Sequence, residues 1–268
     1  NCLRDVDRHM MKLIHSLEDT GQIDNTIIFM ISDHGEMLGQ QGARGKIVSW
    51  EESIRVPTLV YHPDLKDKKL CNSVISNIDI VPTLLEFTGL SKSELRDKHP
   101  ELKGNSYAEL VENVNYDNVR DEEGHLIHGV QIIPTVFEVA EKFRHTALAD
   151  GFLAKTKAFM SEGKFLPDFT PPLNYKGVVD KKHKFLRFFS PRQNNIPTNY
   201  DELTKYNAEY QLYDLENDPF EMNDLAKDEN NRDLLMSMND KCNTLADKEI
   251  GLENHVIHLP GPDWFWTA

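Results

Sequence analysis

A carboxylate and an imidazole stand side by side in the sequence, directly after a continuous apolar run. The run is TIIFMI at residues 26–31, and Asp33 and His34 follow it after a single serine. A carboxylate oxygen and an imidazole nitrogen are reasonable ligands for a divalent cation, and Gly35 would let the backbone turn sharply around a bound ion. Alone, such a pair is more often an ordinary turn that contains a hydrogen-bonded histidine than a pair of ligands.

A glycine-punctuated loop leads from this pair to Lys46. Gly39, Gly42 and Gly45 divide the loop, and their backbone freedom could bring the lysine back over a cation held by Asp33 and His34. A compact ammonium would neutralise charge on a tetrahedral oxyanion and stabilise charge on the leaving oxygen. The alternative is a solvated lysine at the protein surface.

The elements on either side of this segment must position it. Residues 26–31 are rich in β-formers and predict a strand buried on both faces. In an open parallel sheet, ligands bind beyond the carboxyl ends of the strands, so Asp33 and His34 would face the usual crevice. Residues 3–20 predict an amphipathic helix with a stripe facing the core, residues 56–61 a second strand, and residues 74–76 a short third.

The rest of the chain predicts further helices and a small sheet. Asp79 can cap a helix that ends at Gly89, whereas residues 91–130 indicate loops. Helices are expected at residues 134–144 and 152–160. The tail, Trp264-Phe265-Trp266, is expected to dock onto the body of the protein or onto a second subunit.

A small carboxyl-terminal subdomain follows. Residues 177–189 and 209–215 predict two antiparallel strands, and a last helix with Leu235, Met238 and Cys242 in its apolar stripe would cover them. The predicted fold class is therefore α/β: part of a large mixed sheet flanked by helices, plus an α+β subdomain with an antiparallel sheet. The expected division is residues 1–110, an inserted loop and helical region at 111–175, and residues 176–268.

Composition narrows the function classes. Lys and Arg total 30 against 44 Asp and Glu, a formal charge of −14, which argues against a nucleic-acid partner. An acidic enzyme of anionic esters would need a cation to reverse the field locally. The three widely spaced cysteines indicate reduced thiols rather than a disulfide framework or a cysteine zinc site. No apolar run approaches the roughly 20 residues of a membrane span, so we expect a soluble protein, cytoplasmic or periplasmic.

Several blocks of this sequence resemble the sulfatase family of the alkaline phosphatase superfamily. The segment SDHGEMLGQQGARGKIVSWEESIRVP, residues 32–57, is similar to the family's second signature region. NIDIVPTLL at residues 77–85, the triplet Gly104-Asn105-Ser106 and residues 213–225 resemble later family segments. Residues 111–175 match no family pattern and could form an insertion that shapes a substrate pocket or a subunit contact.

The resemblance implies roles for three residues. Asp33 and His34 would coordinate the catalytic cation, with Ca²⁺ the first expectation and Mn²⁺ or Zn²⁺ the alternatives because one ligand is an imidazole. Lys46 would contact the transferred sulfuryl or phosphoryl group as a catalytic and substrate-binding residue. Many sulfatases have Asn where His34 stands. The His form is more similar to phosphonate or phosphate monoester hydrolases and choline-sulfatase-like members, so sulfate and phosphate esters both stay open as substrates.

One part of the family pattern is missing. The family's amino-terminal half carries a paired-Asp metal motif and the Cys- or Ser-x-Pro-x-Arg sequence that yields the formylglycine nucleophile, and neither occurs here. The sequence also lacks an initiator Met. We therefore expect this chain to be the carboxyl-terminal part of a metal-dependent sulfatase, inactive by itself, with the missing half as its partner.

Three alternatives remain at this point. The complete protein could be a phosphonate or phosphate monoester hydrolase, or a phosphomutase-like member of the same superfamily. The chain could instead be a non-catalytic module for binding or oligomerisation, and a homo-oligomer stays open in either case.

Overall fold

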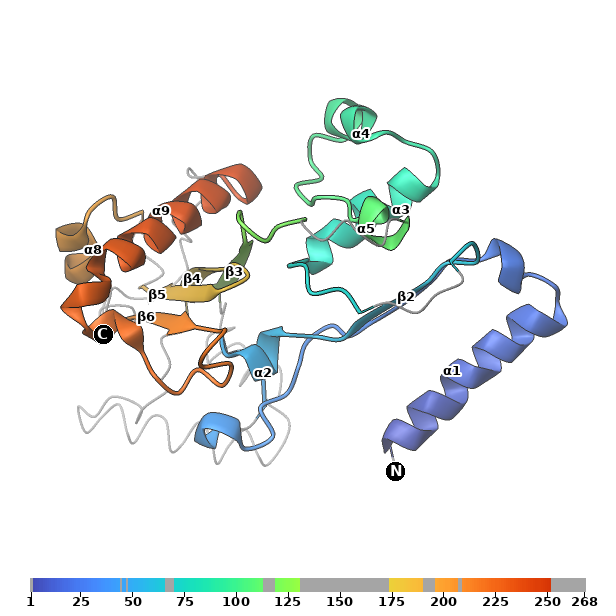
Figure 1. Cartoon of the computed structure of the whole chain (residues 1–268), viewed down its shortest axis with the longest axis horizontal. Helices are drawn as coiled ribbons and strands as arrows, with labels where there is room; N and C mark the ends of the chain where they lie inside the picture. Colours follow the sequence, from blue (N-terminus) through green and yellow to red (C-terminus); the bar gives the residue numbers. More distant parts are fainter. Residues whose placement is uncertain are drawn as a thin grey trace, which may run out of the picture. The chain divides into compact units, whose positions relative to one another are not determined.

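The computed structural model describes residues 2–43, 45–46, 48–65, 70–112, 119–130, 174–189, 196–206 and 209–251. It divides into two compact units (Figure 1). Unit 1 is Asn1–Lys46 with Glu51–Glu122, and unit 2 is Ile47–Trp50 with Glu123–Ala268. Together they form the mixed α/β architecture that the sequence predicts, with antiparallel sheets flanked by helices.

Unit 1 combines a two-stranded sheet with short helices. Strands β1 (Ile28–Ile31) and β2 (Thr58–Tyr61) pair antiparallel, with Ile28 opposite Tyr61. The strands expected at residues 26–31 and 56–61 are thus present, but they pair antiparallel. The expectation that the first is buried on both faces is wrong, because β1 has no buried residue. The helical elements are α1 (Cys2–Asp19), η1 (Ile23–Asn25), η2 (Gln40–Gly42), α2 (Glu51–Ile54), η3 (Asn77–Asp79), α3 (Ile80–Phe87), α4 (Lys92–Lys98) and α5 (Ala108–Glu112).

Helix α1 exposes the stripe that was expected to face a core. The helix itself is confirmed, but none of its residues is buried among those that the structure describes. The side of the helix that carries Leu3 and Leu13 is open, with these side chains 88% and 69% exposed. An apolar helical face of this kind ordinarily packs against another element. Unit 1 as described contains no element that covers it.

Two other predictions for unit 1 are wrong. Residues 74–76 form no strand, and residues 91–130 are not only loops, because they contain α4, α5 and, in unit 2, strand β3 (His125–Val130). Helix α4 begins at a capping box in which Ser91 Oγ accepts from the Glu94 amide at 3.3 Å and Glu94 accepts from the Ser91 amide at 3.0 Å. These reciprocal bonds satisfy two backbone donors that a helix start leaves open, which explains a helix in such a polar stretch.

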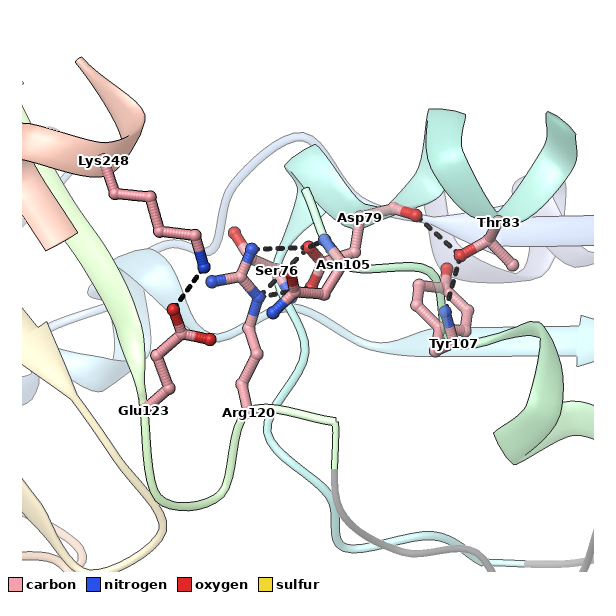
Figure 2. A network of polar contacts seen from close by, with 8 residues as sticks. All are labelled: Ser76, Asp79, Thr83, Asn105, Tyr107, Arg120, Glu123 and Lys248. Carbon is pink, nitrogen blue, oxygen red and sulfur yellow. Dashed lines mark hydrogen bonds and ion pairs between the residues drawn. The ribbon is translucent and has the colours of Figure 1, made fainter. Parts of the chain in front are cut away.

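A buried ion pair organises the second half of unit 1 (Figure 2). Asp79 and Arg120 have fully buried side chains, and Arg120 Nη2 and Nε donate to the two carboxylate oxygens of Asp79 at 2.7 and 2.9 Å. Asp79 also accepts from the amide of Ser76 at 2.8 Å and from that of Asn105 at 2.6 Å. Asp79 stands at the N-cap position of α3 but makes no side-chain cap hydrogen bond there; its carboxylate joins three separate chain segments instead.

Thr83 extends this network by one step. Its hydroxyl donates to the Asp79 carbonyl at 2.6 Å and accepts from the Tyr107 amide at 3.0 Å (Figure 2). Tyr107 is itself buried, and burial is the main reason why its phenol pKa rises to about 12. The segment that precedes α5 is thus fixed to α3 by backbone and side-chain bonds together.

Unit 2 is a four-stranded antiparallel sheet with a long helix on one face (Figure 1). Its strands are β3 (His125–Val130), β4 (Asn174–Val179), β5 (His183–Phe188) and β6 (Glu209–Asp214), in that spatial order. Helices α8 (Tyr200–Tyr206) and α9 (Arg232–Glu249) and the short turns η4 (Leu225–Lys227) and η5 (Glu229–Asn231) complete it. The antiparallel sheet and the covering last helix are confirmed.

One predicted strand of unit 2 is a hairpin. Residues 177–189 were expected to form a single strand, but the chain reverses after β4. Asp180 makes the turn, because one carboxylate oxygen accepts from the amides of Lys182 and His183 at 2.9 and 2.8 Å. Aspartate commonly bonds in this way to the backbone two residues further on. The sequence Asp-Lys-Lys carried that signal.

The core of unit 2 lies between the sheet and α9. Each fully buried Leu or Phe side chain contributes about 1.5–3 kcal/mol to such a core. A buried Lys184–Glu221 pair, 2.6 Å apart, belongs to the same unit. The core cluster consists of Val178, Phe185, Leu203, Leu212, Ala226, Leu235, Met238, Cys242 and Leu245.

Some predictions fall on residues that the structure does not describe. These are the helices expected at residues 134–144 and 152–160 and the aromatic tail at 264–266. All three cysteines are free thiols: Cys2 and Cys71 are exposed and Cys242 is buried. Within the described ranges, no helix has the length and apolarity needed to cross a membrane.

Candidate functional site

The segment that follows β1 is tied to the segment of α2 by its glycine. The amide of Gly35 donates to the Ser53 carbonyl at 2.8 Å. A Cβ atom at position 35 would lie 2.0 Å from the Glu52 carbonyl oxygen, so only glycine fits between these two backbones. Close packing of the two segments therefore holds the residues next to Gly35 in place.

A closed loop returns the chain to this point. The amide of Met37 donates to the Gly45 carbonyl at 2.9 Å, and the Met37 side chain is fully buried. Inside the loop, Gly39 and Gly45 have φ angles of 102° and 85°, which favour glycine. The backbone bond brings residue 46 next to the start of the loop, as the glycine spacing predicts.

The structure brings Asp33, His34 and Lys46 together. His34 Nε2 lies 3.1 Å from Asp33 Oδ2, and the His34 amide donates to Asp33 Oδ1 at 3.0 Å. The Nζ atom of Lys46 contacts the same Nε2 of His34. All three side-chain ends thus meet at one ring nitrogen.

The neighbours of His34 fix which ring nitrogen can bind a ligand. His34 Nδ1 lies 2.8 Å from the Gly35 carbonyl, which can only accept, so Nδ1 carries the hydrogen. In this tautomer Nε2 keeps its lone pair and accepts from the Lys46 ammonium. Metal-binding histidines commonly donate their other N–H to a backbone carbonyl in the same way.

Asp33 is a carboxylate throughout the neutral range. Desolvation raises its pKa, but the hydrogen bond from the His34 amide and the charges of His34 and Lys46 lower the pKa by more, so that it lies below its usual range. The Asp33 side chain is 82% exposed and the His34 side chain 36%. Both groups can therefore be reached by an ion and by a substrate.

The two donor atoms fit a shared cation. Ligands bound at about 2.0–2.6 Å and at right angles around a metal lie roughly 3 Å apart. The 3.1 Å between Asp33 Oδ2 and His34 Nε2 matches that spacing. Among the described residues, no group of three or more His, Cys, Asp or Glu side chains is placed to hold a metal ion. The described residues offer two candidate donor groups, Asp33 and His34, which are fewer than the four or more ligands that a bound cation takes.

Sequence reasoning overlooked the residues that support the site. Ser53 accepts from Gly35, and Ser32 Oγ donates to the His34 carbonyl at 2.8 Å. Met37 anchors the loop. The apolar Met37 in an otherwise small and polar loop is a signal for such an anchor, whereas the two serines carry none.

Comparison with known proteins identifies the first part of the chain. The sequence model of the sulfatase family matches residues 1–90, which include Asp33, His34 and Lys46. This part of the chain is similar to the sulfatase family. An ulvan-active sulfatase of Formosa agariphila is 38% identical over 105 residues, which are 38% of this chain and 19% of that relative.

Solved structures share the fold over both units. A phosphonate monoester hydrolase of Agrobacterium radiobacter has a TM-score of 0.59 and 20% identity, over 92% of this chain and 40% of the hydrolase. A structure in complex with its substrate, D-glucosamine-2-N,6-O-disulfate, has a TM-score of 0.59 and 18% identity, over 94% of this chain and 41% of that protein. The chain thus spans about two fifths of these structures, and the match to the sulfatase relative about a fifth of its length.

Proposed function

We propose that this chain supplies part of the active site of a divalent-metal-dependent hydrolase of sulfate esters. The observation that carries the proposal is the convergence of Asp33 Oδ2 and Lys46 Nζ on the lone-pair nitrogen of His34. Residues 1–90, which contain this cluster, match the sequence model of the sulfatase family. The sulfatase relatives and the fold support the hydrolase class.

In this proposal Asp33 and His34 hold the cation. When bound, the cation polarises the oxygens of the ester group and lowers the pKa of an oxygen nucleophile. Oxygen donors favour Ca²⁺, while the imidazole also suits Mn²⁺ and Zn²⁺. The hydrogen bond from His34 Nδ1 to the Gly35 carbonyl keeps the ring oriented for this task.

Lys46 is the proposed catalytic and substrate-binding residue. A cation at His34 Nε2 would occupy the position that the Lys46 ammonium takes in the structure, so the ammonium would turn to an anionic group instead. The nearest such group in a complex is the ester's sulfuryl oxygen. Lys46 then offsets the negative charge that grows on the leaving oxygen as the ester bond breaks.

In this proposal the nucleophile and further cation ligands come from another part of the complete protein. No Cys- or Ser-x-Pro-x-Arg segment occurs here, and the chain spans 41% of the structure solved with a disulfated glucosamine. The resemblance implies a formylglycine on the missing amino-terminal half. The exposed apolar stripe of α1, which includes Leu3 and Leu13, offers a surface for that half.

A second candidate is hydrolysis of phosphonate or phosphate monoesters. The fold likeness to the Agrobacterium radiobacter phosphonate monoester hydrolase favours it, as does a histidine at position 34. Both reactions use a cation and a lysine to stabilise a tetrahedral oxyanion. The difference lies in the charge and the leaving group of the preferred ester.

The test is activity of the complete protein, expressed from its full reading frame. The specificity constant kcat/KM is measured for an aryl sulfate, an aryl phosphate and an aryl phosphonate monoester, with wild type and Asp33→Ala. We expect the aryl sulfate to be preferred and Asp33→Ala to lower kcat/KM at least about 100-fold, as loss of a metal-site residue typically does. A preference for a phosphorus ester would establish the second candidate. Undiminished activity of Asp33→Ala would remove Asp33 from the site.

A further inference from the structure

Unit 1 contains a pocket that has no part in the cluster around His34. It lies beside helix α4, encloses about 240 Å³ and is partly open to solvent. The lining residues that the structure describes all belong to unit 1. Those that carry the argument are Pro82, Lys92, Leu95, Arg96, Asn105 and Ser106.

The polar wall of this pocket is rigid. The backbone amide of Asn105 donates a hydrogen bond to Asp79, which is paired with buried Arg120 (Figure 2). Gly104, one residue earlier, packs so closely that a Cβ atom there would lie 2.1 Å from the Ile78 carbonyl oxygen. A wall fixed before binding costs little ordering entropy when a ligand enters. The buried Asp79–Arg120 pair thus shapes a surface pocket as well as the interior.

The charges at the pocket favour an anion. Lys92 and Arg96 both line it, and among the described residues Glu109 is paired with Lys92, with Glu109 Oε2 3.2 Å from Lys92 Nζ. These three side chains sum to one positive charge in a chain with a formal charge of −14. Among the described residues, none accepts a hydrogen bond from the Arg96 guanidinium. Its planar donors match the oxygens of a sulfate or carboxylate.

The remaining walls favour a ring with hydroxyl groups. Leu95 and Pro82 offer apolar surface to the C–H face of a ring, and the side chains of Asn105 and Ser106 offer hydrogen-bonding groups to hydroxyls. Pockets for drug-sized ligands measure about 300–1,000 Å³. At about 240 Å³ this pocket accommodates one ring rather than an oligomer.

We propose that the pocket formed by α4 and residues 102–106 binds a single hydroxylated ring that carries a sulfate or carboxylate group. Arg96 and Lys92 bind the oxyanion, while Asn105 and Ser106 contact the hydroxyls. No covalent step is involved. The proposal stands independently of the hydrolase function, because it uses none of the residues of that site.

The experiment is an NMR titration of the ¹⁵N-labelled chain. The probes are glucosamine 6-sulfate, glucuronate and neutral glucose, and the readout is the shift of the Asn105 and Ser106 backbone amides. We expect the sulfated sugar, the carboxylated sugar or both to shift these amides with a dissociation constant on the order of millimolar, typical of small weak ligands. Comparison of glucosamine 6-sulfate with glucuronate identifies whether the pocket binds a sulfate or a carboxylate. Equal binding of glucose, or no shift with either anionic sugar at about 20 mM, overturns the proposal.

Three variants locate the bound sugar. Arg96→Gln should weaken binding about two- to fivefold, the range for a partly exposed charge. The matched control is Lys103→Gln, which removes an equal charge from an exposed position beside the pocket without removing a lining side chain. Lys46→Gln should leave binding at the pocket unchanged. If Lys46→Gln abolished binding and Arg96→Gln did not, the sugar would lie at the hydrolase site and the pocket proposal would fail.

Discussion

The Gly35 amide donates a 2.8 Å hydrogen bond to the Ser53 carbonyl and so couples the segment after β1 to helix α2. Asp33 and His34 immediately precede this contact, and a Cβ at position 35 would lie 2.0 Å from the Glu52 carbonyl oxygen. The orientation of the proposed cation ligands thus depends on a position where no side chain fits.

Gly35→Ala is the first prediction. The added methyl group overpacks the contact with the Glu52 carbonyl and should cost about 1–3 kcal/mol of unfolding free energy, measured by urea denaturation. In the complete protein, the displaced backbone should also lower kcat/KM for the preferred ester. The control is Gly21→Ala, because Gly21 has a φ of +66° and no atom lies within 4 Å of the added Cβ. This variant should lose about 1–2 kcal/mol of unfolding free energy and keep its activity. Equal activity of both variants would contradict the positioning role of Gly35.

Asp79→Asn should destabilise unit 1 strongly. It removes the charge that compensates the buried Arg120 guanidinium, and breaking a buried pair in this way costs about 3–5 kcal/mol. The measurement is the free energy of unfolding in urea. Arg8→Gln, which breaks an exposed pair with Asp5, should change it by less than about 1 kcal/mol. A comparable loss in both variants would mean that Asp79 does not organise the unit.

Glu94 should titrate far below an ordinary glutamate. The hydrogen bond from the Ser91 amide is the largest cause, followed by Lys98 and the Ser91 hydroxyl, and together they lower its pKa to about 2 from 4.5. Because the folded-state pKa is the lower one, this carboxylate stabilises α4 above pH 4.5, and the contribution disappears as the pH falls from 4.5 to about 2. A ¹³C titration of the side-chain carboxyl carbon measures the midpoint directly. A midpoint near 4.5 would show that the capping box is not formed.

Leu13→Gln should distinguish this chain from the complete protein. Leu13 is 69% exposed on α1, so the substitution should change the stability of the chain alone by no more than about 0.5 kcal/mol. If the missing half covers α1, the same change should cost about 1–3 kcal/mol in the complete protein. The neighbouring Lys12→Gln serves as the control in both. Equal, small effects of Leu13→Gln in both proteins would place the partner surface elsewhere.

The parts of the fold that follow from local sequence were predictable. The run at residues 26–31 predicts β1, and the stripe with Leu235 and Met238 predicts α9 and its buried face. The glycine spacing predicted that Lys46 returns to His34. In each case the signal lies within one element or one short loop.

The remainder depends on contacts between distant segments. Arg120 reaches Asp79 across 41 residues, and nothing in its polar surroundings distinguishes it from a surface arginine. Apolar residues continue on both sides of the turn at Asp180, so the sequence pattern predicts one strand where the structure has a hairpin. The start of α4 was overlooked although Ser91 and Glu94 have capping-box spacing, because the charges around them resemble a loop.

The cation site itself is tested most directly by metal content. The complete protein and its Asp33→Asn variant are purified without chelator, and bound Ca²⁺, Mn²⁺ and Zn²⁺ are measured by mass spectrometry alongside hydrolysis of the aryl sulfate. Asp33→Asn keeps the side-chain shape and removes a charged ligand, so we predict that it loses most of the bound cation and of the activity, with partial recovery of both at high added metal. A variant that retains a full equivalent of cation and wild-type hydrolysis would contradict the assignment of Asp33 and His34 as its ligands.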